Sequence, residues 1–127
     1  MTTSHDYDTS YEPAAPIVRV GLSPSGESAI QQSVTALIDS GADATMIPTN
    51  VLHAAGARYV GHLQMRGVVG ESVKVKLYLT AVHLGDHHIH GIRAIGGKIG
   101  SEAIIGRDVL NQLEVTLNGL AHETWIK

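Results

Sequence analysis

The segment Ala36–Pro48, which reads ALIDSGADATMIP, constrains the fold more than any other part of the chain. Apolar residues lead directly into Asp39, Ser40 and Gly41 follow, and a second carboxylate stands at Asp43. The residues before Asp39 predict a strand, because aliphatic side chains pack well on a half-buried sheet. This strand would deliver a carboxylate to the start of a loop.

The loop itself has two interpretations. Asp39 or Ser40 could cap a helix, because Asp and Ser are good N-cap residues. Alternatively, Gly41 permits a tight backbone and the close approach of another group to the carboxylate. Ser40 then adds a compact hydroxyl that can bond to the backbone. The second interpretation predicts a chemical site at the end of the strand.

The rest of the chain predicts an all-β domain with an aliphatic core. Its 127 residues suit one domain, and they are 43% hydrophobic with no Phe and 14 Gly. This composition favours short strands and tight turns. Residues 1–15 are mostly polar and predict a flexible N-terminal arm before a domain at residues 16–127. A strand added at a subunit interface is the alternative for the arm.

Alternating apolar residues predict a series of strands and hairpins. The longest hairpin covers residues 58–84, with its tip at Gly67–Gly70 and with Val73, Val75 and Leu77 on one face of its second arm. Other strands are predicted at residues 16–22, 29–39, 87–95, 101–106 and, around an Asn118-Gly119 turn, at 115–117 and 120–127, with helical turns at 48–56 and 107–113.

Charge and composition exclude several classes of function. The net charge is −3 without a basic block, which argues against nucleic-acid binding. The chain has no Cys, which excludes disulfides, thiolate nucleophiles and Cys-based zinc sites. No apolar run approaches the roughly 20 residues that span a bilayer, and the N-terminus lacks the pattern of a signal peptide. We therefore expect a cytoplasmic protein without a membrane partner.

Three segments together resemble the retropepsin-like aspartic proteases. ALIDSGADATMIP is similar to their active-site stretch, and AIIGRDVLNQLEVTLNG (Ala103–Gly119) is similar to their C-terminal Gly-Arg-(Asn/Asp) segment. MRGVVGESVKVKLY (Met65–Tyr78) resembles their flap hairpin. The order and spacing agree from Pro16 to about Gly119. The resemblance implies a closed β-barrel with a flap hairpin and one short C-terminal helix.

The resemblance also implies a mechanism. Each subunit supplies one catalytic aspartate, here Asp39, and a homodimer pairs the two at a two-fold axis. Two carboxylates about 3 Å apart cannot both ionise, and they therefore share a proton. One then acts as general base on a water, and the other donates to the scissile carbonyl of a peptide or protein substrate. No cofactor and no metal are implied.

Further roles follow from the same resemblance. Ser40 would donate across the two-fold axis to the partner's loop. Gly41 would place its backbone N–H against the carboxylate, and Ala42 would support the same loop. Asp43 would bind the substrate backbone and form an ion pair with Arg107, and we expect that pair to be partly buried.

The hairpin tip completes the expected binding site. Gly67, Val68 and Val69 would close over an extended peptide, because two valines at an exposed tip favour a partner. The segment LAHETWIK after Gly119 resembles non-viral members, which implies a cellular or bacterial protein and not a retroviral one. Trp125 would anchor the dimer sheet or the core.

Two alternatives stay open at this point. The first is a catalytically weak or silent peptide-binding or dimerisation module with the same fold. The second is a metal-binding hairpin, since four of the eight His stand in VHLGDHHIHG, where His88 and His90 share a strand face and Asp86 is a further candidate ligand. A solvated hairpin edge explains these histidines as well, and nothing indicates a supporting shell. We therefore predict no metal site.

Overall fold

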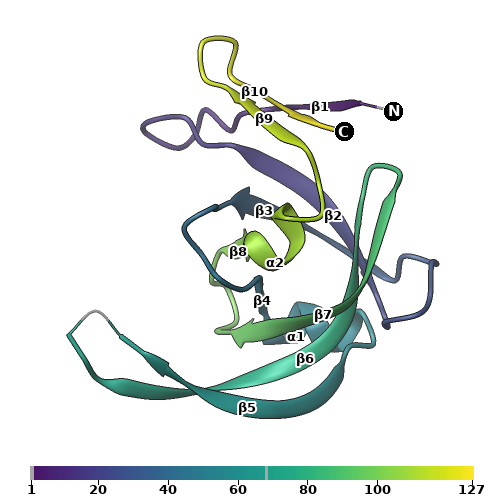
Figure 1. The fold of residues 1–127 in the computed structure, drawn as a ribbon, viewed down its shortest axis with the longest axis vertical. Coiled ribbons are helices and arrows are strands. Elements are labelled where there is room, and N and C mark those ends of the chain that lie inside the picture. The colour runs from purple at the N-terminus through teal and green to yellow at the C-terminus, as the bar shows by residue number, and fades with distance from the viewer. Residues whose placement is uncertain (1, 68) are drawn as a thin grey trace.

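The computed structural model describes residues 2–67 and 69–127, which form a β-barrel and a separate small sheet (Figure 1). The elements in chain order are β1 (Thr3–Asp6), β2 (Ile17–Ser23), β3 (Gln32–Ile38), β4 (Met46–Pro48), α1 (Thr49–Ala54), β5 (Arg58–Arg66), β6 (Ser72–Leu84), β7 (His87–Gly97), β8 (Ala103–Ile105), α2 (Arg107–Leu110), β9 (Val115–Asn118) and β10 (Glu123–Ile126).

The barrel closes through strand pairing at both ends of its sheet. The strand order is β2-β3-β8-β4-β7-β6-β5, and β2 also pairs with β6. Six strands therefore form a closed ring, with β5 outside it on the far edge of β6. The pairs β3–β8 and β4–β7 are parallel, and the others are antiparallel. The predicted all-β class and closed barrel are confirmed.

The barrel interior is aliphatic, because the chain has few aromatic residues to place there. The largest fully buried apolar side chains come from five strands and α1: Leu22, Ile47, Leu52, Leu84, Ile105 and Ile126. Burying a side chain of this size contributes roughly 1.5–3 kcal/mol each. This core holds the C-terminal ends of β3 and β8 side by side, with Ile38 opposite Ile105.

The long hairpin β5–β6 extends beyond the barrel (Figure 1). Leu63, Met65 and Val73 are exposed, and the register places them on one face. At the tip, the N–H of Gly67 donates to the carbonyl of Glu71 at 2.8 Å, and Gly70 has a φ of 86°. A positive φ of this size suits glycine. The hairpin predicted as a flap is therefore present, with its apolar face uncovered in one protomer.

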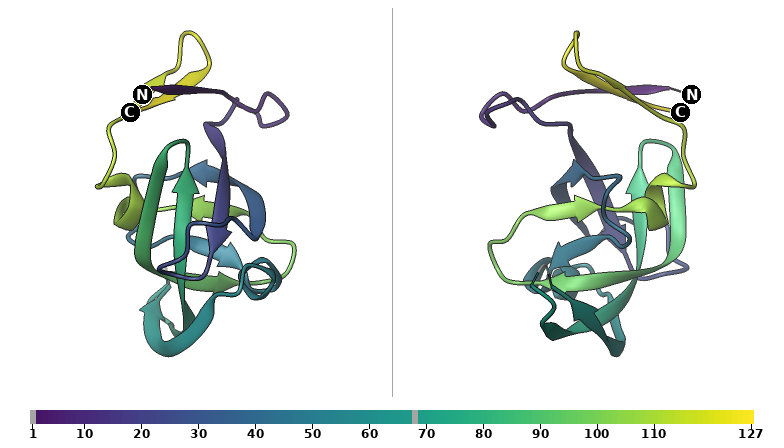
Figure 2. Two further views of the ribbon diagram at one scale, coloured as in Figure 1. Left: turned by 90° about the vertical axis from the view of Figure 1, so that its right-hand side faces the viewer. Right: turned by 60° about the vertical axis from the view of Figure 1, so that its left-hand side comes forward.

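The second sheet has the order β1-β10-β9 and lies at one end of the barrel, where both chain termini meet (Figures 1 and 2). Thr3 pairs with Ile126, and Asp6 pairs with Glu123. The sequence predicted a flexible arm at residues 1–15, and the structure places residues 3–6 of it in this sheet. Backbone hydrogen bonds to an edge strand need no apolar pattern, and composition therefore does not reveal them.

Both helices are short. The predicted C-terminal helix is α2, and α1 lies in the segment expected to form a helical turn after Pro48. The helix α1 ends at Ala54, and the chain turns two residues later at Gly56, which has a φ of 76°. Neither of these helices, the only ones in the described part of the chain, is long and apolar enough to cross a membrane.

Candidate active site

Asp39 lies immediately after β3, at the start of the loop that leads to β4. Its backbone N–H donates to the carbonyl of Ile105 at 3.0 Å, which ties the loop to β8. The N–H of Gly41 donates to Asp39 Oδ1 at 2.9 Å, as the close approach of a glycine allows. A Cβ on Gly41 would stand 3.2 Å from that oxygen. No helix follows Asp39, and β4 comes next in the chain. The capping interpretation is therefore wrong.

Arg107 fastens the next part of the loop. Its backbone N–H donates to the carbonyl of Ala42 at 2.9 Å, and its guanidinium donates to the carbonyl of Ser40 at 2.6 Å. The guanidinium also forms an ion pair with Asp43. The Asp43 side chain is 90% exposed in the single protomer, which differs from the expected partial burial. The lone protomer leaves this face of the loop open to solvent.

Asp108 and Thr45 form a contact that sequence reasoning missed. The Asp108 carboxylate accepts the backbone N–H of Thr45 at 3.0 Å and its hydroxyl at 2.7 Å. It also accepts the N–H of Val109 at 2.9 Å. Thr45 is fully buried, and its Oγ1 in turn accepts the N–H of Gly106 at 3.2 Å. Three consecutive residues, 106–108, therefore hold the loop from Ser40 to Thr45.

Gly106 occupies a position where a side chain has no room. A Cβ there would lie 2.7 Å from the backbone carbonyl carbon and oxygen of Ala44. We expect Gly106→Ala to lower the free energy of unfolding by about 1–3 kcal/mol, because the clash is with backbone and cannot be relieved by a rotamer change. Urea unfolding at fixed protein concentration measures this loss.

Gly119→Ala is the matched control for that substitution. Nothing lies within 4 Å of a Cβ at Gly119, and its φ is not positive. We expect its free energy of unfolding to stay within about 0.5 kcal/mol of the unmodified chain. Equal losses in the two variants would contradict the close contact between Gly106 and the loop.

The flap residues lie apart from Asp39 in this structure. Gly67 and Val69 stand at the tip of β5–β6, which is well separated from the C-terminal end of β3 in Figure 1. Val69 is 87% exposed. Val68 lies outside the described residues. The binding roles of these three residues, and those of Ser40, Ala42 and Asp43, stay predictions.

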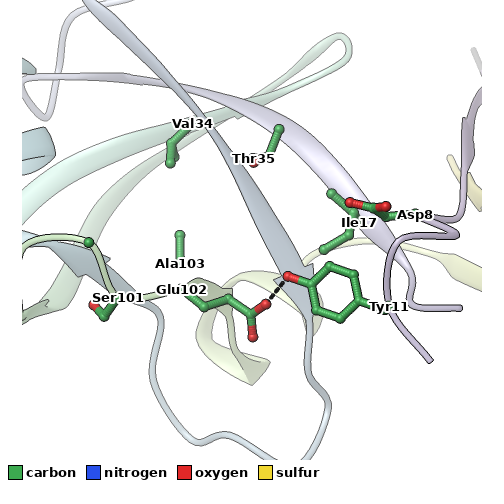
Figure 3. Close-up of a pocket in the computed structure, with 9 residues that line it drawn as sticks. Asp8, Tyr11, Ile17, Val34, Thr35, Ser101, Glu102 and Ala103 are labelled. Atoms are coloured by element: carbon green, nitrogen blue, oxygen red, sulfur yellow. Dashed lines mark hydrogen bonds between the residues drawn. The ribbon is translucent and has the colours of Figure 1, made fainter. Parts of the chain in front are cut away.

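A pocket of about 360 Å³ lies elsewhere, under the N-terminal loop (Figure 3). The residues that line it come from that loop, from β2 and β3 and from the chain around the start of β8: Asp8, Tyr11, Ile17, Val34, Thr35, Gly100, Ser101, Glu102 and Ala103. Tyr11 donates its hydroxyl to the Glu102 carboxylate across the opening. Asp39 does not line this pocket and is half-buried at the start of its loop.

The histidines of the β6–β7 hairpin do not converge on a metal position. His90 Nδ1 accepts the N–H of Gly26 at 3.0 Å, and His88 Nδ1 lies 2.6 Å from His83 Nδ1. In the ranges 2–67 and 69–127, no group of three or more His, Asp or Glu is arranged to hold a metal ion. Both ring nitrogens of His83 and the Nδ1 of His90 are instead hydrogen-bonded within the protein.

A family model and a solved structure both relate this chain to proteases. Residues 29–112 match the family model described as gag-polyprotein putative aspartyl protease. Among solved structures, EIAV protease in complex with the inhibitor HBY-793 matches with a TM-score of 0.61 and 22% sequence identity. The match covers 77% of this chain and 86% of the viral chain, and it shows a shared fold. No curated protein matches.

Proposed function

The chain belongs to the gag-polyprotein putative aspartyl protease family, and on this premise we propose that it is an aspartic endopeptidase that works as a homodimer. The observation that carries the proposal is the loop after β3. The loop carries one half-buried carboxylate, Asp39, which accepts the N–H of Gly41, and Arg107 and Asp108 hold the loop through Ser40 and Thr45. Each protomer supplies half of the reacting groups.

The chemistry needs two such loops face to face. Within the described residues, the Asp39 carboxylate has one hydrogen-bond donor, the N–H of Gly41. A second Asp39 across a two-fold axis provides the other carboxyl group, and the pair holds one proton between them. The ionised member takes a proton from a water as it attacks the peptide carbonyl, and the protonated member donates to the carbonyl oxygen. The apparent pKa values of such a site describe the two coupled carboxyl groups together and not either residue alone.

The flap supplies the roof of the proposed site. The exposed apolar face of β5–β6 carries Leu63, Met65 and Val73, and it provides surface for the side chains of an extended peptide. Closure of this hairpin over the substrate excludes water from the carboxylates, and electrostatic interactions strengthen in the drier site. The expected substrate is therefore a peptide or an extended segment of a protein.

Dilution tests the homodimer directly. We expect the rate of peptide cleavage per protomer to fall as the protein is diluted below the dissociation constant of its dimer, because a monomer has only one Asp39. The measurement is cleavage of a diverse peptide library at several protein concentrations, with the dimer fraction determined in parallel by sedimentation.

Two outcomes would contradict the proposal. If the cleavage rate per protomer stays constant while sedimentation shows conversion to monomer, the active site is not shared between two protomers. A verified dimer that cleaves no peptide between about pH 4 and 7, the range in which a carboxylate pair shares its proton, would favour a peptide-binding or dimerisation module instead.

A further inference from the structure

The most unusual polar cluster outside the candidate site joins β2, β6 and β7. His83, on β6, is only 3% exposed. Its Nε2 lies 2.7 Å from Ser23 Oγ, and its Nδ1 lies 2.6 Å from His88 Nδ1. His90 stands beside it, with ring centroids 6.1 Å apart, and accepts the N–H of Gly26. The cluster thus links the 24–27 turn after β2 to the β6–β7 hairpin.

The hydrogen bonds of the cluster fix where each proton lies. Ser23 Oγ is 2.6 Å from the carbonyl oxygen of Glu27, which can only accept. Ser23 therefore donates to Glu27, and His83 Nε2 must carry the proton that points at Ser23. In neutral His83, Nδ1 is then an acceptor. His88 must donate to it through Nδ1–H.

His90 is fixed in the same way. A backbone N–H is a donor only, and the nitrogen that it contacts, His90 Nδ1, must be unprotonated. The outer ring nitrogen, Nε2, carries the proton of neutral His90. His83 and His90 thus each accept a hydrogen bond at Nδ1. Protonation of His90 Nδ1 removes its bond to Gly26, whereas a protonated His83 keeps its bond to His88 only if His88 moves its own proton to Nε2.

No carboxylate is paired with the cluster to offset such a proton in the described part of the chain. The 24–27 turn, the β6–β7 turn and the start of β7 carry the charged and titratable groups Glu27, Asp86, His87, His88 and His90. The neighbouring strands β1, β2 and β7 add His5, Asp6, Arg19 and Arg93. Burial, together with the rings of His88 and His90, lowers the pKa of His83. A protonated His83 would be a buried cation, and its Nδ1–H would face the N–H of His88 unless His88 changed tautomer.

The contacts from Ser23 to His83 and from His83 to His88 resemble those of a catalytic triad, but their role is structural. Ser23 is fully buried, so no substrate reaches its hydroxyl. Its proton is already directed at the Glu27 carbonyl. The arrangement therefore serves to connect strands.

We propose that His83, His88 and His90 form a proton-sensitive latch that holds the 24–27 turn on the β6–β7 hairpin when neutral and loosens as the solution becomes acidic. The geometry disfavours an added proton at two places: at His83, which is buried, and at His90 Nδ1, which accepts the N–H of Gly26. The contact between Gly91 N–H and Ser25 Oγ, at 2.9 Å, is the part of this junction that has no titratable group.

The direction of the pH effect follows from proton linkage. The folded state resists protonation of His83, whereas the unfolded chain takes up that proton near pH 6.5, the usual histidine pKa. Below about pH 6.5 the unfolded state therefore binds more protons, and stability falls with pH until folded His83 is also protonated. Above about pH 6.5 the contribution is fully present.

Two variants isolate this effect. His83→Gln keeps an N–H donor for Ser23 but cannot be protonated, and His62→Gln is the control, since His62 is exposed on the β5–β6 hairpin. For the unmodified chain we expect additional proton uptake on unfolding below about pH 6.5, up to one proton per protomer above the control's background. This uptake changes the unfolding constant by at most roughly tenfold per pH unit. His5, whose pKa burial also lowers, contributes to that background in every variant.

The measurement is urea unfolding at several pH values and one protein concentration. His83→Gln should lose the extra proton uptake, and His62→Gln should retain it. Equal pH slopes in His83→Gln and the unmodified chain would overturn the latch.

If His83→Gln does not fold, nitrogen NMR of the unmodified chain still tests the proposal, because it identifies which ring nitrogen of each histidine carries the proton. At pH 7.5 we expect Nε2–H for His83 and His90 and Nδ1–H for His88. Any other tautomer set overturns the assignment. Zinc chloride is the remaining probe: a higher melting temperature with zinc, lost in His83→Gln, would make the cluster a metal site instead, and an unchanged melting temperature supports the latch.

Discussion

Asp39→Asn is expected to abolish peptide cleavage while leaving a folded dimer. The substitution preserves the size of the side chain and an oxygen that can accept the N–H of Gly41. It removes the ionisable groups that share a proton, and an amide can neither take the proton of the attacking water nor share one with its partner. We expect cleavage to fall by at least about 10³-fold. Steady-state cleavage of the best library peptide, with melting temperature and dimer fraction alongside, measures the loss.

A mixing experiment makes this prediction sharper. When equal amounts of the unmodified chain and Asp39→Asn exchange subunits freely, about one quarter of the dimers contain two aspartates. If both aspartates are required, total activity should fall to about one quarter of the value for all-unmodified dimers at the same total protein concentration. A value near one half would show that each protomer acts alone, and Asp39 would then need a different role.

Asp108→Ala should cause the largest loss of stability among single substitutions around the site. The carboxylate accepts the backbone N–H and hydroxyl of Thr45 and the N–H of Val109. Thr45 is fully buried, and water cannot easily replace the lost acceptor. An unsatisfied buried donor costs about 1–3 kcal/mol, and we expect a total loss of roughly 2–4 kcal/mol in the free energy of unfolding. Urea unfolding at fixed concentration measures it.

Asp43→Ala is the matched control, because it removes an aspartate of the same loop network whose side chain is 90% exposed. A surface ion pair contributes about 0–1 kcal/mol, and this variant should lose no more than that. If Asp43→Ala proved as destabilising as Asp108→Ala, the Arg107 ion pair and not the Asp108 contact would be the main fastening of the loop. Cleavage assays on both variants would then separate folding from substrate binding.

Sequence patterns were sufficient where the information is local. The Asp39-Ser40-Gly41 stretch after an apolar strand predicted a carboxylate on a loop, because that pattern depends on residues next to one another. The β5–β6 hairpin followed from apolar alternation and the glycines at its tip. The same local signals supported the family assignment, which the family model and the shared fold confirm. The cellular origin of the chain stays a prediction.

Patterns were insufficient where a contact joins distant residues. Thr45 and Asp108 are 63 positions apart, and neither stands out in a list of polar residues. Asp108 even occupies the variable last position of the Gly-Arg-(Asn/Asp) motif, which a search for invariant residues passes over. His83 lies within an apolar alternation that predicts burial but not its partners. Only the barrel, which brings β2, β6 and β7 together, reveals the hydrogen bonds of that histidine.

The pairing of β1 with β10 affects the order in which the elements of the chain can assemble during folding. β1 pairs with β10, and Thr3 lies opposite Ile126. During synthesis on the ribosome, β1 emerges long before its partner β10, because all the barrel strands lie between them in the chain. The barrel strands, whose partners are closer along the chain, can associate sooner. The β1-β10-β9 sheet is therefore the last piece to assemble, and until then its edges are free to meet other nascent chains.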